Sequence, residues 1–149
     1  MTGPFYMMDL FIYGTLRDRD VCEKVLGRPV SGDDISPATA TNFAIFKVAD
    51  VSYPCLLPVA GATAIGARLS GLSEQDIAIL DRFEGVNYRR VPIAISLGDG
   101  SHVMSEYYQP NDALQTDGAW DLALWQQEGK QAFLSRDFAL SGVRVPSHV

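Results

Sequence analysis

The sequence contains few of the residues from which metal, disulfide and nucleotide sites are usually built. Of 149 residues, only two are cysteine and two are histidine. Cys22 and Cys55 fit no metal-binding or redox spacing, and His102 and His148 are too isolated to form a metal site. No Gly-x-Ser-x-Gly elbow, phosphate-binding loop or Gly-x-Gly-x-x-Gly motif occurs. We therefore expect no metal, and we expect the cysteines to be small buried residues in a reducing compartment.

Positive charge is also scarce and dispersed. The chain has 12 basic and 18 acidic residues, for a net charge of −6, and Arg89-Arg90 is its one adjacent basic pair. This pattern argues against a nucleic-acid or anionic-membrane partner, because phosphate binding requires a clustered positive face. The first residues lack a basic segment, Asp9 interrupts their apolar run, and no run reaches membrane-spanning length. We expect a cytoplasmic protein.

The overall composition is that of one globular domain. Hydrophobic residues make up 47% of the chain and charged residues 20%. The sequence predicts a single domain over residues 1–149, with a core at about 9–138 and a loosely held C-terminal tail. Strand patterns dominate the middle and helices are few, which favours an α+β fold with a mixed or antiparallel sheet, curled into a small barrel.

The strand predictions follow from apolar runs and from their glycine and proline boundaries. Gly66 and Gly71 mark positions of a bulge or close backbone approach, and Asp99-Gly100 predicts a hairpin turn. Pro54 and Pro58 limit the piece between them to a brief or edge strand. The expected strands are residues 10–13, 39–48, 55–57, 62–72, 88–97 and 102–108.

Three helices are expected. Asp18 caps the first, which ends at Gly27. The second begins at Ser73 with a near match to the capping box, in which Asp76 replaces the usual glutamate. Gly85 supplies a left-handed stop for that helix and leaves Glu84 in its last turn. The third covers residues 120–138 and docks through an apolar face.

The stretch after the first strand has two interpretations. Gly14 allows a tight turn before the first helix, and the amides of Thr15, Leu16 and Arg17 are then expected to point outward as a cradle for an anion or a carbonyl oxygen. The alternative is a turn that only connects a strand to a helix. The residues alone leave both interpretations open.

Glu84 is the carboxylate that the pattern singles out for acid–base chemistry. The negative end of the helix dipole disfavours its charged form, and Phe83, Val86 and Tyr88 are expected to add desolvation. Both effects raise the pKa of Glu84 toward the range that suits a general acid or base. The alternative is an ordinary surface glutamate.

Four segments of the sequence resemble the γ-glutamylcyclotransferase-like superfamily, especially its plant avirulence-induced-gene and bacterial branch. The first is Tyr13-Gly14-Thr15-Leu16-Arg17, and the second is Tyr53-Pro54 with its apolar piece up to Pro58. The third runs from Leu80 to Val91, and the fourth is the tryptophan-bearing segment 120–134. Together they cover roughly residues 10–135. Their order and spacing make the resemblance specific.

The resemblance implies a small mixed barrel with flanking helices and an enzyme that needs no cofactor. Such enzymes close a γ-glutamyl group on its own α-amine, which releases 5-oxoproline and an amine or amino acid. By this resemblance the loop of Tyr13, Gly14, Thr15 and Leu16 binds the γ-glutamyl group, and Glu84 moves the protons. Tyr88 is expected to contribute to the same pocket.

Two other functions remain beside this one. The same fold can bind a small acidic metabolite without turnover, or Glu84 can activate water in an amide hydrolase. A carboxylate beside an anion cradle favours the enzyme over the binder. The partner expected from the sequence is a small γ-glutamyl molecule, with the leaving group and the oligomeric state left open.

Overall fold

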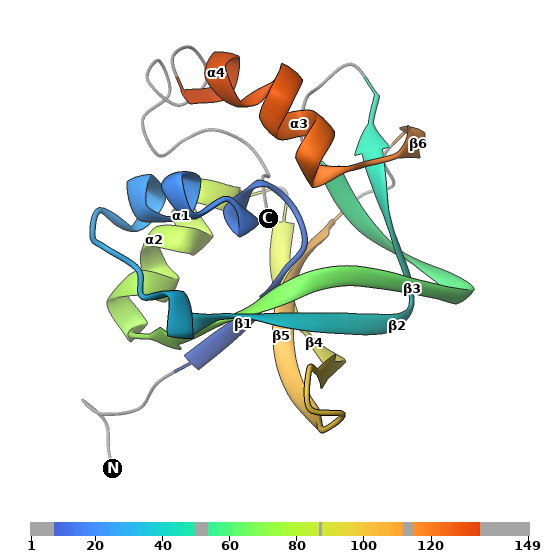
Figure 1. Cartoon of the computed structure of the whole chain (residues 1–149), viewed down its shortest axis with the longest axis horizontal. Helices are drawn as coiled ribbons and strands as arrows, with labels where there is room; N and C mark the ends of the chain where they lie inside the picture. Colours follow the sequence, from blue (N-terminus) through green and yellow to red (C-terminus); the bar gives the residue numbers. More distant parts are fainter. Residues whose placement is uncertain (1–7, 50–53, 87, 112–114, 135–149) are drawn as a thin grey trace.

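The computed structural model describes residues 8–49, 54–86, 88–111 and 115–134, and Figure 1 shows them along the chain. The described part has the α+β architecture that the sequence predicts, with helices beside one curled sheet. The strands are β1 (Met8–Ile12), β2 (Ile35–Val48), β3 (Pro54–Leu72), β4 (Tyr88–Leu97), β5 (His102–Pro110) and β6 (Thr116–Ala119). The helices are α1 (Arg19–Leu26), α2 (Glu74–Glu84), α3 (Leu122–Glu128) and α4 (Lys130–Ala132), with 3₁₀ turns η2 (Thr15–Arg17) and η3 (Gly32–Asp34).

The sheet is antiparallel and curls on itself. Its order is β1-β3-β2-β4-β5, with β6 paired to β2, and every pairing between the described strands is antiparallel. In Figure 1, β4 and β5 cross the long β2–β3 pair, and the curl brings β5 beside β1. There the Ser105 hydroxyl donates to Asp9 Oδ1 at 3.0 Å, and the Tyr13 hydroxyl donates to the Tyr108 carbonyl at 3.2 Å. These bonds link the two ends of the sheet in a small barrel-like fold.

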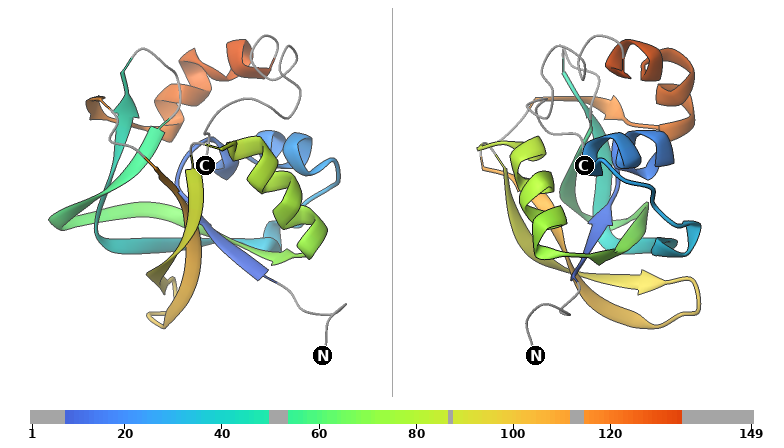
Figure 2. Two further views of the ribbon diagram at one scale, coloured as in Figure 1. Left: turned by 180° about the vertical axis from the view of Figure 1, so that it is seen from behind. Right: turned by 90° about the vertical axis from the view of Figure 1, so that its left-hand side faces the viewer.

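The first two helices begin and end where the sequence predicts. The Asp18 carboxylate accepts the amides of the first turn of α1, and Gly27 ends that helix at φ 71°. Ser73 and Asp76 form the complete capping box of α2, with bonds of 3.1 and 3.0 Å. Figure 2 shows α1 and α2 packed together at one side of the sheet. Local capping chemistry therefore sets these boundaries, while core packing holds the helices in place.

The prediction for β2 and β3 was wrong in extent. β2 starts at Ile35 instead of residue 39, and β3 is one 19-residue strand instead of two. Thr41 of β2 pairs with Thr63 of β3, and Phe43 pairs with Pro58. Asn42 alone therefore lies opposite residues 59–62. Asn42 adopts φ 68°, and its side chain accepts the Gly61 amide at 2.9 Å. Pro58 has no N–H to donate to the ladder of hydrogen bonds, and the bulge lets β3 continue beyond it.

The last predicted helix was also wrong in part. The helical part begins at Leu122 instead of residue 120 and is divided into α3 and α4 at Gly129. Residues 116–119, for which no element is predicted, form the exposed strand β6. Asp121 caps α3 by accepting the Leu124 amide at 2.9 Å. Residues 135–138 lie outside the described part of the chain. By contrast, β4 has the predicted bounds, and Gly100 in the following turn adopts φ 88°.

Asp18 joins α1 to the α3–α4 segment and gives a pH-dependent prediction. Its buried carboxylate accepts the Gln126 amide at 2.8 Å and pairs with Lys130 Nζ at 3.0 Å. Burial raises the Asp18 pKa, but these partners and the Val21 amide outweigh it and hold the pKa below the ordinary 3.8. A lowered pKa stabilises the folded state above pH 3.8, and this contribution disappears as the pH falls through the folded-state value.

We expect Asp18→Asn to lower the free energy of unfolding by about 1–2 kcal/mol at pH 6, since asparagine caps a helix but carries no charge. The difference from the unsubstituted chain shrinks as the pH falls through the lowered folded-state pKa of Asp18. Urea unfolding at a series of pH values measures this. Asp117→Asn, on exposed β6, is the control. A difference that stays the same from pH 2 to pH 6 contradicts the assigned role of the charge.

Candidate functional site

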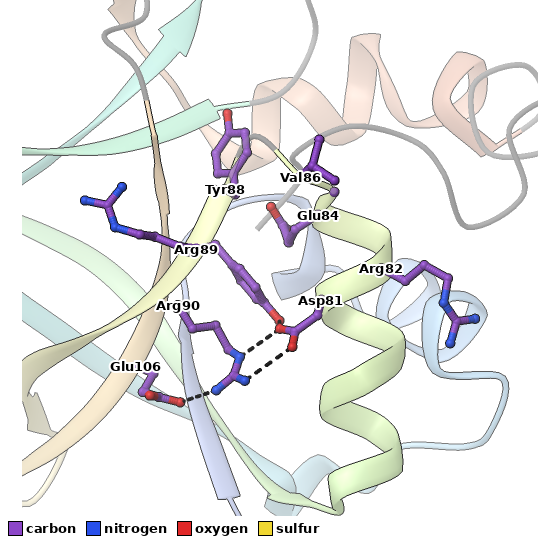
Figure 3. A pocket seen from close by; sticks show the side chains of 10 residues that line it. Asp81, Arg82, Glu84, Val86, Tyr88, Arg89, Arg90 and Glu106 are labelled. Carbon is purple, nitrogen blue, oxygen red and sulfur yellow. Dashed lines mark hydrogen bonds and ion pairs between the residues drawn. The ribbon is translucent and has the colours of Figure 1, made fainter.

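A cavity of about 970 Å³ opens between the C-terminal end of α2 and the strands β4 and β5. Figure 3 shows that side chains from all three elements surround it. The lining residues are Asp81, Arg82, Glu84, Gly85, Val86, Tyr88, Arg89, Arg90, Glu106 and Tyr108. Glu84 and Tyr88, two of the residues selected from the sequence, thus meet at one cavity.

Glu84 is the last residue of α2 and is only 1% exposed although it lines the cavity. Phe83 beside it is fully buried and anchors this turn in the core. Gly85 ends the helix as predicted, but with φ 87° and ψ −178° instead of the left-handed conformation, and its amide bonds to the Asp81 carbonyl at 3.0 Å. Glycine alone adopts this backbone readily. Local sequence therefore places the Glu84 carboxylate, as predicted, at a helix end.

The surroundings of Glu84 differ from the prediction at one residue. Val86 is 92% exposed, so it does not desolvate Glu84 as expected from the sequence. Its position follows from the turn at Gly85, which directs the chain outward before β4 (Figure 3).

The loop Tyr13–Leu16 packs inside the protein next to this site. Tyr13, Gly14, Thr15 and Leu16 are all buried. Burial raises the pKa of the Tyr13 hydroxyl well above its ordinary value, and the charge of nearby Glu84 contributes further. Tyr13 is therefore close to the candidate carboxylate. The four loop residues are not part of the cavity wall itself.

The predicted cradle of three amides is wrong for one of them. η2 is a 3₁₀ turn in which the Arg17 amide donates to the Gly14 carbonyl at 3.0 Å. In a 3₁₀ turn each amide donates to the carbonyl three residues earlier. The Arg17 amide is therefore committed to the turn and does not point outward toward a ligand. The cradle hypothesis is thereby restricted to the amides of Thr15 and Leu16.

An ionic network that the sequence analysis did not identify fixes α2 against the sheet. Arg90 Nε and Nη2 donate to the two carboxylate oxygens of Asp81 at 2.7 and 3.2 Å, and Nη1 donates to Glu106 at 2.7 Å (Figure 3). The Tyr108 hydroxyl adds a bond of 2.7 Å to Asp81. Such a bidentate pair sets both distance and orientation. The last turn of α2, which carries Glu84, is thus tied to β4 and β5.

A second set of bonds holds the connection between α2 and β4. Arg89 donates to Asn111 Oδ1 at 2.8 Å and to Gln109 Oε1 at 2.7 Å. The Asn111 side chain in turn donates to the Val86 carbonyl at 3.0 Å. In the sequence, Arg89 and Arg90 stand out only as the adjacent basic pair. The sequence offers one signal for a role of these arginines at the site, which is their position at the start of a strand directly after the turn that follows Glu84.

The two cysteine thiols add no nucleophile to this site. Both cysteines are buried, and burial raises the pKa of Cys22 to about 12 and that of Cys55 to about 11. Thiols of this kind are poor nucleophiles.

In the described ranges no three histidine, cysteine or acidic side chains gather as metal ligands. Nor does any helix there have the length and apolar character to cross a membrane.

Comparisons of the sequence and of the structure with known proteins point to the same family. Residues 10–127 match the family model described as "Gamma-glutamyl cyclotransferase, AIG2-like". AIG2-like protein D of Arabidopsis thaliana is 28% identical over 145 residues, which cover 93% of each chain. The same fold occurs in a solution structure from Arabidopsis thaliana, with a TM-score of 0.69, 21% identity, and coverage of 94% of this chain and 85% of that one. It also occurs in a structure named gamma-glutamyl cyclotransferase, with a TM-score of 0.63, 11% identity, and coverage of 74% and 70%.

The family model spans the loop at Tyr13, the helix that ends in Glu84 and the strands that line the cavity. The chain belongs to the AIG2-like gamma-glutamyl cyclotransferase family.

Proposed function

We propose that this protein is a γ-glutamylcyclotransferase that converts a γ-glutamyl amine or peptide to 5-oxoproline and a free amine. The observation that carries the proposal is the Glu84 carboxylate, which is 1% exposed and yet lines a cavity of about 970 Å³. A carboxylate shielded from bulk water beside a substrate-sized space suits proton transfer. Membership of the family supports the choice of reaction.

In this proposal the reaction proceeds in two steps. The α-amine of the γ-glutamyl group attacks the γ-carbonyl carbon, and Glu84 takes the proton that the amine loses. The tetrahedral intermediate carries an oxyanion, which the amides of Thr15 and Leu16 stabilise. The bond from carbon to the leaving nitrogen then breaks, and Glu84 returns the proton to that nitrogen. The products are 5-oxoproline and the released amine, and no cofactor takes part.

The remaining residues of the site have supporting roles in the proposal. Gly14 lets the backbone approach the γ-glutamyl group closely, Tyr13 borders it beside Glu84, and Tyr88 contributes to the cavity wall. Arg90 is a positioning residue, since its bonds to Asp81 fix the turn that carries Glu84. The proposed location is the cytoplasm, which agrees with two unpaired cysteines.

A panel of γ-glutamyl amines and γ-glutamyl dipeptides tests the proposal. We expect 5-oxoproline and the free amine to form in equal amounts from at least one compound, measured by chromatography of the products. Free glutamate in place of 5-oxoproline identifies the amide hydrolase. Saturable binding without either product contradicts the enzyme and supports the metabolite-binding alternative.

A further inference from the structure

A second cavity, of about 250 Å³, lies between β2, β6 and α3 and shares no lining residue with the cavity of Glu84. Figure 1 shows β6 and the start of α3 beside one end of β2. The wall of this second cavity includes Trp120 and Trp125, which are the two tryptophans of the chain. The volume is below the roughly 300–1,000 Å³ of drug-sized pockets, so the space suits a small molecule.

Trp125 presents an unused hydrogen-bond donor at this cavity. Its side chain is 5% exposed, and within the described part of the chain its Nε1–H has no hydrogen-bond acceptor. An edge-to-face contact with Phe133, with ring centroids 5.8 Å apart, fixes the ring. A Cβ at Gly129 would lie 2.8 Å from Trp125 Cδ1 and 2.9 Å from Nε1, so only glycine fits beside this edge of the indole without crowding the donor. Buried donors in native proteins normally have a partner, and this one indicates an acceptor that arrives with a ligand.

The charges around the cavity indicate what kind of ligand carries that acceptor. Lys47 contributes an ammonium group that takes part in none of the ion pairs between described residues. Asp121 and Glu128 contribute two carboxylates, so the wall carries one positive and two negative charges. Arg17 acts electrostatically on Asp121 from outside this wall, so a lone carboxylate ligand meets no net attraction here, whereas a ligand that also carries an ammonium group meets both signs of charge.

We propose that this cavity binds a free amino acid with an apolar side chain. Its carboxylate accepts from Trp125 Nε1 and Lys47, and its ammonium group faces Glu128 and Asp121. Its side chain packs on Trp120. This site acts independently of Glu84 and of the cyclisation proposed above.

Nuclear magnetic resonance of the ¹⁵N-labelled full chain tests the proposal, because the two indole Nε1–H signals report on the cavity directly. Trp120→Phe assigns them. We expect L-leucine to move the Trp125 signal downfield in a saturable way. We expect 4-methylpentanoate, which lacks the ammonium group, and isopentylamine, which lacks the carboxylate, to bind more weakly than leucine.

Lys47→Met is expected to weaken leucine binding by about two- to fivefold, because an exposed charge contributes modestly. Lys24→Met, which removes an exposed lysine from α1, is the matched control and leaves binding unchanged. The backbone spectrum of each variant verifies its fold. No saturable shift with leucine overturns the site, equal binding of 4-methylpentanoate overturns the zwitterionic ligand, and equal losses in both lysine variants overturn the role of Lys47.

Discussion

Glu84→Gln lowers the rate of 5-oxoproline formation by roughly 10²–10⁴-fold, the usual contribution of a general acid–base group. Glutamine keeps the size of the side chain but accepts no proton, so the α-amine loses its base and the leaving nitrogen its acid. The measurement is the initial rate with the γ-glutamyl compound that the panel identifies. Since the substitution removes proton transfer more than binding, we expect kcat to fall with a smaller change in KM.

The control for this prediction lies on the same helix. Glu74→Gln changes an exposed glutamate in the first turn of α2, at the opposite end from Glu84. Its turnover is expected to equal that of the unsubstituted chain. Circular dichroism and urea unfolding establish that both variants are folded. If folded Glu84→Gln turns over at the full rate, Glu84 has no part in the chemistry and the mechanism proposed above fails.

Gly66→Ala is expected to lower the free energy of unfolding by about 3 kcal/mol, at the upper end of typical overpacking effects. A Cβ at this position of β3 would lie 2.5 Å from the Ile12 carbonyl oxygen and 2.7 Å from Phe11 Cζ. Neither neighbour moves easily, because one is backbone in β1 and the other is a fully buried ring. The sequence predicted a bulge or close approach at Gly66, and the close approach is confirmed.

Urea unfolding with Gly98→Ala as the control measures this effect. Gly98 lies in the turn between β4 and β5, where a Cβ meets open space and no positive φ is required. We expect the control to differ from the unsubstituted chain by less than about 0.5 kcal/mol, as at most surface positions. Equal stability of the two variants contradicts the steric account. Because Ile12 directly precedes the Tyr13 loop, Gly66→Ala is also expected to reduce turnover.

The parts of the fold that the sequence predicted depend on interactions within a few residues. Asp18 and Ser73 cap helices because their side chains reach amides two or three positions along the chain. Gly27 ends α1 because that position has φ 71°. The position of Glu84 in the last turn of α2 follows from the same local chemistry. No knowledge of the rest of the molecule is needed for these features.

The errors have a common physical origin in pairing between distant segments. Pro58 ends a strand on local grounds, but β3 continues through it because a bulge opposite Asn42 absorbs the change of register. β6 carries no strand signal in its Thr-Asp-Gly-Ala sequence and pairs with β2 all the same. Strand pairing depends on partner and context more than on intrinsic preference.

The candidate site also combines local features, which the sequence predicts, with contacts between distant segments, which it does not predict. Glu84 and the Tyr13 loop were selected from the sequence, since a helix end and a glycine turn are local features. The bonds of Arg90 to Asp81 and Glu106 span 9 and 16 residues, and the bond from Tyr13 to Tyr108 spans 95. The exposure of Val86 likewise depends on where the chain leaves the helix. By itself the sequence determined how α1 and α2 begin and end and which residues are candidates for the site. Only the tertiary structure decided which of them meet, because the curl of the sheet sets distances between segments that no local pattern encodes.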